Sequence, residues 1–501
     1  MDRPSVNLVA SSHNPDGWLS PQRRRDAQSR DPFFKSVQWS ADGTTLFTSS
    51  SSNRICTYVL PESLLKPRQS PVNLTAHGTL VLPEPTSAIA PCPYFALEHP
   101  STQVLLTAST DHPIHLHHAF PPQSPSSPVR DSPPPSSSSS SSPSSPSPSS
   151  SSSPSSSSSS SSSSWSPSLS PQSQPPPLGT FRLIKPETEA YLPIASLVWP
   201  APGTHFVAGT ANLIAVYDVS RPDVGTAAEP LLSIPTIPST RHLAKGGGVG
   251  MRGTVAALAS QPAIAGDEPG WGGAGVLAAG TWTRSLALYD VMRAGACIAT
   301  WSVAGAAREV GVGGKGVVQT VWSPCGRYLV VNERGARGLL VYDVRGTHQL
   351  LAWLEGRDGE TNQRLSCDVF PGSEGVGGFE VWAGTKDGGV VVWEGVGNQE
   401  GGISPSWDWK AHGSAVGSVA MHMSGSVVAT CSGSWKIADK SYDSGSSEDS
   451  SDESGSEGSA GVRGNLKPRV VVQETSLKVW SIGPSDSSQG ERSPSEGEAE
   501  S

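Results

Sequence analysis

The sequence predicts an all-β protein, a seven-bladed β-propeller of the WD-repeat type. Three observations predict it: a unit of three short apolar stretches occurs seven times, the third stretch often ends in an aromatic residue followed by an acid, and no long stretch has helical periodicity. Short runs rich in Val, Ile, Leu, Tyr and Trp that are separated by Gly, Asp or Pro are typical of strands. Because one unit alone would expose two apolar faces, the units must pack against one another and close into a ring.

The seven units follow one another along the chain. They comprise residues 35–60, 94–120, 194–219, 254–291, 318–344 and 365–394, and a seventh unit, 416–433, that resumes at 475–483 after an acidic insertion. The propeller is therefore expected to span residues 31–483. An N-terminal segment, residues 1–30, precedes it, and within this segment residues 6–10 are expected to close the ring as a strand of the last blade.

Four units end in an aromatic residue and an acid that replace the Trp-Asp pair of WD repeats. The acids Asp218, Asp290, Asp343 and Glu394 are spaced 72, 53 and 51 residues apart, close to the roughly 40–50 residues of a four-stranded blade. One acid per blade at the same register indicates that each acid caps a turn. Acid–base catalysis would instead need one pair of groups, one acting as the acid and the other as the base. The residues assigned to blade ends are Tyr217, Asp218, Tyr289, Asp290, Tyr342, Asp343, Trp393, Glu394 and Trp480.

Three segments have compositions that cannot bury enough apolar surface to offset the entropy of ordering, and we predict that they are disordered. Residues 121–178 are mostly Ser and Pro and are expected to lie between blades two and three. Residues 436–467 form a Ser/Gly/acidic insertion between the second and third strands of blade seven, and residues 484–501 form an acidic tail. Such insertions lengthen surface loops at little thermodynamic cost.

Three serines of the acidic insertion are candidate phosphorylation sites. Ser446, Ser450 and Ser454 each stand three residues before an acid, a pattern suited to an acid-directed kinase. Phosphate at these positions would deepen the negative charge of the insertion and would not order a helix. The alternative is an inert solubilising segment.

No arrangement of residues predicts catalysis, a cofactor, a metal ion or a small-molecule substrate. The Gly-rich stretches 246–253 and 311–316 do not complete a phosphate-binding loop, and the trio His115, His117 and His118 lacks further ligands nearby in the sequence, which favours a degenerate blade end over a metal site. The six cysteines contain no CxxC pair and are expected to be buried free thiols. With no signal-peptide pattern and no run of about 18 apolar residues, we expect a soluble intracellular monomer without membrane contact.

Positive charge gathers in blades four to six, although the formal charge of the chain is −9. If several of these side chains share a face, they would form a basic patch for phosphate backbones, and ordinary solvated surface is the alternative. The candidate residues are Arg284, Lys315, Arg327, Arg334, Arg337, Arg345, Arg357 and Arg364.

Several short sequence motifs in the repeats resemble those of the telomerase Cajal body protein family. The most specific is TNQR, residues 361–364, within GETNQRLSCDVFP and followed by WAGTKDGGVVVWE. The resemblance extends from about residue 31 to residue 483. Five further segments resemble the family and occur in the same order: DPFFKSVQWSADGTTLFTSSSSNRICTYVLP, HPIHLHHAF, FRLIKP, YDVSRP and TRSLALYD. The Ser/Pro insertion, the missing acidic N-terminal extension of animal members and several lost Trp-Asp pairs depart from the family pattern.

The resemblance implies a non-catalytic scaffold that binds small Cajal body RNAs or telomerase RNA together with ribonucleoprotein partners in the nucleus, in Cajal bodies. Such proteins read unpaired loop bases while basic side chains hold phosphates. Carried onto this chain, it favours Asn362, Gln363 and Arg364 as RNA-binding residues, with Arg284 and Arg345 as phosphate or stacking partners. The alternative is a protein-interaction hub, for example a spliceosomal adaptor without direct RNA contact.

Overall fold

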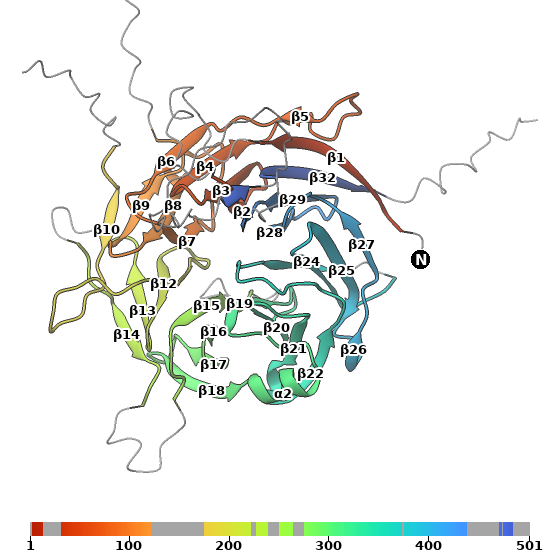
Figure 1. Cartoon of the computed structure of the whole chain (residues 1–501). Coiled ribbons are helices and arrows are strands. Elements are labelled where there is room, and N and C mark those ends of the chain that lie inside the picture. The colour runs from red at the N-terminus through yellow and green to blue at the C-terminus, as the bar shows by residue number, and fades with distance from the viewer. Residues whose placement is uncertain are drawn as a thin grey trace, which may run out of the picture. The chain divides into compact units, whose positions relative to one another are not determined.

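Seven sheets surround a central axis, and each forms one blade of a closed ring (Figure 1). The structure is a computed structural model that describes residues 3–13, 32–121, 175–221, 227–238, 250–263, 275–372, 375–437, 470–472 and 474–483. In each blade, four strands form an antiparallel sheet with the first strand at the axis. The predicted all-β, seven-bladed propeller is confirmed.

The first four blades follow one another from residue 34 to residue 302. Blade 1 contains β2 (Phe34–Trp39), β3 (Thr45–Ser50), β4 (Arg54–Val59) and β6 (Gly78–Val81). Blade 2 contains β7 (Thr86–Pro91), β8 (Val104–Ser109), β9 (Ile114–His118) and β10 (Gly179–Phe181). Blade 3 contains β11 (Ser196–Val198), β12 (His205–Thr210), β13 (Leu213–Asp218) and β14 (Leu232–Pro235). Blade 4 contains β15 (Val255–Ser260), β16 (Val276–Thr281), β17 (Ser285–Asp290) and β18 (Ala296–Ser302).

Of the last three blades, only blade 7 combines strands from both ends of the chain. Blade 5 contains β19 (Val317–Trp322), β20 (Tyr328–Glu333), β21 (Leu339–Asp343) and β22 (Leu350–Leu354). Blade 6 contains β23 (Cys367–Pro371), β24 (Phe379–Gly384), β25 (Gly389–Val396) and β27 (Trp407–Lys410), and blade 7 contains β28 (Val416–Met421), β29 (Val427–Ser432), β32 (Ser476–Gly483) and β1 (Ser5–Ser12). Strands β26 (Gly401–Ile403) and β5 (Val72–Asn73) extend blades 5 and 7 in parallel, and β30 (Trp435–Ile437) pairs with β31 (Val470–Val472). The helical elements are α2 (Ala304–Glu309), η2 (Pro100–Thr102) and η3 (Val344–Gly346).

The N-terminal strand closes the ring. β1 pairs antiparallel with β32 from Ser5 opposite Gly483 to Ser12 opposite Leu477, so that the first described residues supply the outer strand of the last blade. Strand β5, which belongs to the blade 1 segment of the chain, then pairs in parallel with β1. The expected closing strand, residues 6–10, lies within β1.

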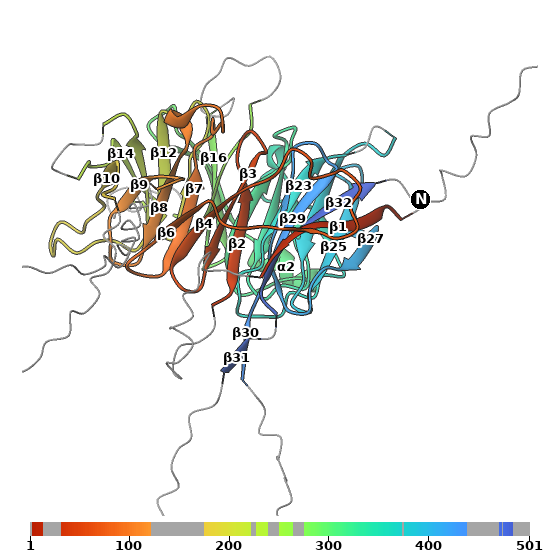
Figure 2. The same ribbon diagram turned by 90° about the horizontal axis from the view of Figure 1, so that it is seen from above.

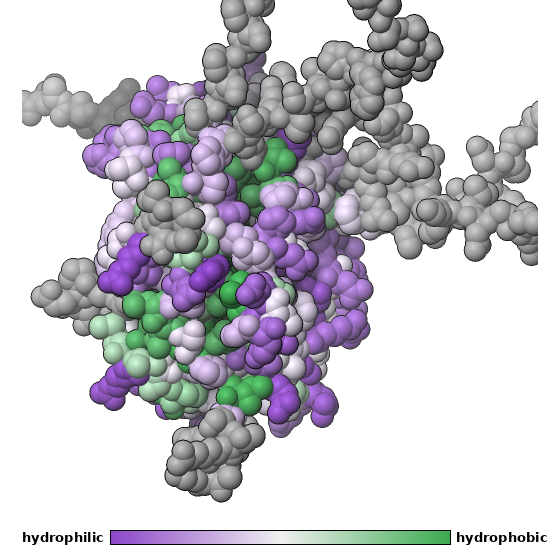
Figure 3. Space-filling view, turned by 90° about the vertical axis from the view of Figure 1, so that its left-hand side faces the viewer, coloured by the Kyte–Doolittle hydropathy of each residue, from purple (hydrophilic) through white to green (hydrophobic). Residues whose placement is uncertain are grey.

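The core is a series of apolar clusters between neighbouring blades. Between blades 5 and 6, for example, Val330 and Val341 pack with Trp393, and between blades 4 and 5 Leu286 packs with Leu340. The rim of blades 2 and 3 instead shows small apolar groups among hydrophilic residues (Figure 3). Each blade therefore depends on its two neighbours, as the sequence pattern required.

Strand direction assigns every loop to one of two faces. The loops that lead into first strands and those that join second to third strands share one face, which we call the entry face. The loops that join first to second and third to fourth strands share the opposite face, which we call the turn face. The β30–β31 pair projects from the entry face (Figure 2).

Four turns on the turn face share a glycine with a positive φ angle. Gly43, Gly203, Gly326 and Gly425 follow the first strands of blades 1, 3, 5 and 7, with φ angles of 71°, 79°, 67° and 72°. A residue with a Cβ atom is strained at such angles, so glycine ends each of these turns. This is why the sequence units carry a Gly between their first two apolar stretches.

Blade 2 differs from the prediction. Its first strand is β7, which ends before residue 94, where the sequence unit was expected to begin. β10 pairs with β9, so the Ser/Pro segment joins the third and fourth strands of blade 2 and does not lie between blades 2 and 3. The prediction failed because β10 has only three residues, too few for a recognisable alternation. Almost all of the Ser/Pro segment, almost all of the acidic insertion with Ser446, Ser450 and Ser454, and the tail lie outside the described residues.

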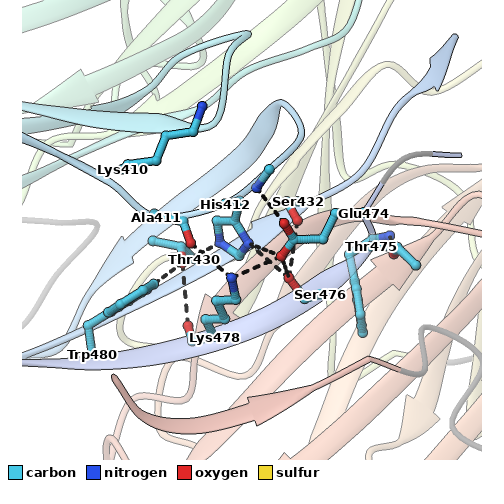
Figure 4. A network of polar contacts seen from close by, with 12 residues as sticks. Lys410, Ala411, His412, Thr430, Ser432, Glu474, Thr475, Ser476, Lys478 and Trp480 are labelled. Carbon is cyan, nitrogen blue, oxygen red and sulfur yellow. Dashed lines mark hydrogen bonds and ion pairs between the residues drawn. The ribbon is translucent and has the colours of Figure 1, made fainter. Parts of the chain in front are cut away.

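A polar network fixes blade 7 next to the acidic insertion (Figure 4). The buried His412 ring contacts the Thr430 hydroxyl at 2.7 Å and the Ser476 hydroxyl at 2.9 Å, and the Trp480 indole N–H donates to Thr430 at 2.8 Å. The Glu474 carboxylate accepts from Ser476 at 2.7 Å and from Lys478 at 2.9 Å. Hydrogen bonding, with His412 the largest contributor, holds the pKa of Glu474 far below its usual range.

Replacing Glu474 with Gln is expected to destabilise the protein at neutral pH by about 1–2 kcal/mol, since hydrogen bonds to a charged group are lost. The folded-state pKa is depressed, so the contribution of the carboxylate is present above its unfolded pKa of about 4.3 and fades as the pH falls below that value. Urea unfolding at pH 7 and under acid conditions measures both effects. Glu360→Gln, at an exposed ion pair with Arg337, is the matched control, and equal stability of Glu474→Gln and wild type at pH 7 would contradict the assignment.

Candidate nucleic-acid interface

The axis of the propeller is a cavity of about 1000 Å³. All seven first strands line it, through residues such as Val37, Ile89, Ser196, Thr320 and Val419. Most of the lining is small, apolar or neutral, and Asp368 is the only acidic side chain among the described lining residues. Charged side chains at its mouths therefore decide what the channel attracts.

Three cations gather at the mouth on the entry face: Lys35, Arg334 and Arg364. Lys35 lies near the start of β2, Arg334 directly follows β20, and Arg364 precedes β23. We call these residues, together with Trp282, the cationic mouth. Burial lowers the pKa of Lys35, and the nearby charge of Arg364 lowers it further. Burial also lowers the pKa of Arg364 to about 10, and here the charge of Arg334 adds to the effect. Three cations gathered at one mouth attract an anion, which would offset the repulsion between them.

These cations have no acidic partner among the described residues. The Lys35 ammonium donates to the Thr86 carbonyl at 2.9 Å and the Arg364 guanidinium donates to the Val318 carbonyl, which orients both groups without neutralising them. The Arg334 Nε is buried and lacks a hydrogen-bond partner in the described part of the chain. Each group therefore retains its charge for a ligand.

An exposed aromatic ring lies beside the cations. Trp282, in the loop after β16, is 51% exposed, and the Arg334 guanidinium lies 5.7 Å from the centre of its ring. A large exposed indole beside a cation provides a stacking surface for a planar group. Charge and stacking surface thus meet at one mouth of the channel.

The TNQR segment is held in place from both sides. The Gln363 side chain donates to the Gly433 carbonyl of blade 7 at 2.8 Å, and its backbone N–H donates to the Thr361 hydroxyl at 3.2 Å. On the other side, buried Arg357 and Asn332 both donate to the Leu365 carbonyl, at 3.1 and 2.8 Å. Asn362 is exposed on the entry face. The segment thus presents Asn362 and Arg364 from a fixed loop.

The other two residues assigned to RNA do not join this group. Arg284 makes two hydrogen bonds to Glu333, at 2.6 and 2.9 Å, which ties blade 4 to blade 5. Arg345 lies on the turn face, because Asp343, its partner at 2.8 Å, stands opposite Tyr328 at the far end of blade 5 from Arg334. A six-residue strand separates the two ends by roughly 17–20 Å.

The rest of the predicted basic patch is divided in the same way. Arg327 also pairs with Asp343 on the turn face, at 2.9 Å, and Arg337 pairs with Glu360 at 2.7 Å. Arg357 is buried, and Lys315 is exposed next to Arg334 on the entry face, where its backbone N–H donates to the Arg334 carbonyl at 2.9 Å. Of the eight candidates, the structure therefore places Arg334, Arg364 and Lys315 together without acidic partners among the described residues.

Three of the four blade-end acids serve turns. The carboxylates of Asp218, Asp290 and Asp343 accept backbone N–H groups of Ser220, Arg293 and Arg345, at 2.9, 3.0 and 3.0 Å. Glu394 accepts from the Trp407 indole at 3.0 Å.

The aromatic residues before these acids lie between blades. Tyr217, Tyr289, Tyr342 and Trp393 are buried, and the Trp393 indole donates to the Glu355 carbonyl at 3.0 Å. Burial raises the pKa of each of the three tyrosines. Like the acids, these rings have structural contacts.

The described residues contain no metal-ion cluster of His, Cys, Asp or Glu. The rings of His115 and His117 lie 5.5 Å apart, and burial lowers the pKa of His117 to about 4, so it stays neutral. Four of the six free cysteines are buried, whereas Cys297 and Cys325 are exposed, which corrects the expectation for these two. Among the described helices, none has the length and apolarity that a membrane crossing requires.

Sequence reasoning left Lys35 and Trp282 out of the site. Both occupy loops or strand ends of the same class as Arg364, since Lys35 stands at the start of a first strand and Trp282 joins a second strand to a third. Aligning the units by strand and asking which side chains share the entry face would have grouped them. The residue types alone gave no indication, because a Lys and a Trp are ordinary within these repeats.

No protein-family model matches the chain, and no curated protein matches it by sequence. The fold is that of WD-repeat scaffolds, which typically serve as interaction platforms and are commonly non-enzymatic.

Proposed function

We propose that the protein is a non-catalytic scaffold that binds small structured RNA at the cationic mouth. The observation that supports this most directly is the meeting of Lys35, Arg334 and Arg364, without acidic partners among the described residues, with the exposed ring of Trp282. Cations hold phosphates and an aromatic ring stacks on an unpaired base. Sequence-specific RNA recognition mostly targets unpaired loops with splayed bases, so an unpaired loop is the element proposed to bind.

The TNQR resemblance supports a narrower proposal. The RNA is a small Cajal body or telomerase-type RNA, and the protein places this ribonucleoprotein in the nucleus together with partner proteins. Immunoprecipitation followed by sequencing of the RNA that co-purifies tests this step. Recovery of small nuclear RNAs of another class would keep the scaffold proposal and reject the Cajal body assignment, and recovery of no RNA would favour the protein-interaction hub.

Replacing Arg334 and Arg364 together with Ala is expected to weaken binding of a labelled single-stranded RNA by about tenfold or more, because two phosphate contacts are lost. Fluorescence anisotropy over a range of salt concentrations measures affinity and its salt dependence. The slope of log K against log salt should become shallower by about 0.7 for each lost contact.

Arg345→Ala and Arg337→Ala are the controls, since each removes one positive charge from a paired arginine outside the cationic mouth. Both are expected to bind RNA within about twofold of wild type. If the double variant keeps the affinity and slope of wild type, or if Arg345→Ala loses as much, the RNA does not bind at this mouth.

A further inference from the structure

A second pocket, of about 380 Å³, lies on the turn face, at the opposite end of the ring from the cationic mouth. The turns that follow the first strands of blades 1 and 7 form two of its walls, and the end of β23 in blade 6 forms the third. We call it the Asp368 pocket, after the acid at its base. Its principal lining residues are Trp39, Asp368, Phe370, Met421, His422 and Met423.

The walls of the Asp368 pocket are aromatic and thioether side chains. The rings of Trp39 and His422 meet edge to face at 4.8 Å, and the Trp39 indole N–H donates to the Ala420 carbonyl at 2.9 Å, which fixes the ring. Met423 is 65% exposed at the rim. Faces of aromatic rings attract cations, and methionines adapt to ligands of varied shape.

The base of the pocket is a carboxylate without a cation. Asp368 accepts the backbone N–H of Met421 at 2.7 Å and that of Val369 at 2.9 Å, and no ion pair involving Asp368 occurs among the described residues. Burial raises its pKa to about 6, so the group is still mostly ionised at neutral pH. The other titratable group in the pocket, His422, has its pKa lowered by burial and adds no positive charge.

The chemistry of the pocket selects among ligands. An anion is repelled by Asp368, and a purely apolar group would leave the carboxylate further desolvated with no compensating partner. A metal ion would need more oxygen or nitrogen ligands than the described residues offer there. A planar guanidinium can bond both carboxylate oxygens while its faces contact the rings, whereas an ammonium is a strongly hydrated point charge.

We propose that the Asp368 pocket binds the side chain of an arginine presented by a partner protein. Charge complementarity selects the guanidinium, and the open side of the pocket on the turn face lets a chain segment deliver it. Trp39, Asp368 and Met421 also line the central cavity, but no residue of the cationic mouth lines this pocket, so this inference can fail while RNA binding at the mouth holds. A scaffold with the two sites would hold an anion on one face and a basic protein segment on the other.

Binding of a fluorescein-labelled peptide of repeated Arg-Gly-Gly to the full chain tests the proposal, by anisotropy at physiological ionic strength. Asp368→Asn, which keeps the shape of the acid, is expected to weaken binding by about tenfold or more. A peptide with citrulline in place of arginine, of similar shape and without charge, is expected to bind wild type more weakly by a similar factor. On Asp368→Asn the two peptides should bind alike, because the two changes remove the same interaction.

Asp408→Asn is the matched control, since it removes an exposed acid of the same blade and should leave affinity within about twofold of wild type. Met423→Lys places a cation at the rim without touching Asp368, and is expected to reduce binding even if Asp368→Asn fails to fold. Equal binding of the arginine and citrulline peptides, or wild-type affinity in Met423→Lys, would overturn the proposal. A lysine peptide that binds as well as the arginine peptide would overturn the assignment to arginine.

Discussion

A chain that lacks residues 1–13 is expected to lose about 5 kcal/mol or more of its free energy of unfolding, which is most of the stability of an ordinary domain. β1 is the outer strand of blade 7 and pairs with β32 along its whole length. Without it, the edge of β32 is exposed and Ala10, which is fully buried, no longer packs with Leu477 and Val479. Blade 7 would then keep only three strands, next to the point where the ring closes.

Thermal unfolding monitored by circular dichroism measures this loss, and binding of a hydrophobic dye reports whether apolar surface becomes exposed. The sharpest control is complementation. A synthetic peptide that spans residues 3–13 should restore the melting temperature in a concentration-dependent manner, because it binds only the folded ring. A peptide of the same composition in scrambled order should not. A shortened chain that melts like wild type would show that the ring does not depend on β1.

The first three strands of most blades could be predicted from the sequence because each is an alternating run flanked by turn residues. Several fourth strands could not, since β6, β10 and β14 have three or four residues and pair only because a longer strand precedes them in space. The prediction that the Ser/Pro segment lies between blades 2 and 3 was wrong for the same reason, because its position depends on the pairing of β10 with β9.

The candidate site was predictable only in part, for a geometric reason. Arg334 and Arg345 are close in sequence, but one strand crossing carries the chain from the entry face to the turn face between them. Lys35 and Arg364 are far apart in sequence, yet each stands at the entrance of a first strand and so reaches the same mouth. The pairing of Arg284 with Glu333 depends on packing between blades, which no linear pattern reveals.

Arg357 illustrates how a side chain assigned to a basic patch can instead support the fold. It is only 3% exposed, and burial lowers its pKa. Its guanidinium donates to the Gly384 carbonyl at 3.0 Å, the Asn332 side-chain oxygen at 2.7 Å and the Leu365 carbonyl at 3.1 Å. These three acceptors belong to blade 6, blade 5 and the loop that carries Arg364, so one cation joins two blades to the cationic mouth.

Replacing Arg357 with Leu is expected to destabilise the protein by about 3–5 kcal/mol, because three buried acceptors each lose a hydrogen bond at once, although Leu365 keeps the one from Asn332. Arg357→Lys should recover part of this, since one ammonium on a shorter stem cannot reach all three acceptors in the same geometry. Urea unfolding measures both variants. Arg337→Leu, at an exposed ion pair with Glu360, should cost less than about 1 kcal/mol and is the matched control.

The same substitution separates support of the fold from direct contact with RNA. Because Arg357 reaches the cationic mouth only through Leu365, the folded fraction of Arg357→Lys should bind RNA with an unchanged salt slope, whereas loss of Arg364 makes the slope shallower. A shallower slope in Arg357→Lys would mean that Arg357 contacts phosphate itself and is accessible in solution. Unchanged stability in Arg357→Leu would mean that the apolar cluster and the Gln319–Cys367 hydrogen bonds join blades 5 and 6 without Arg357.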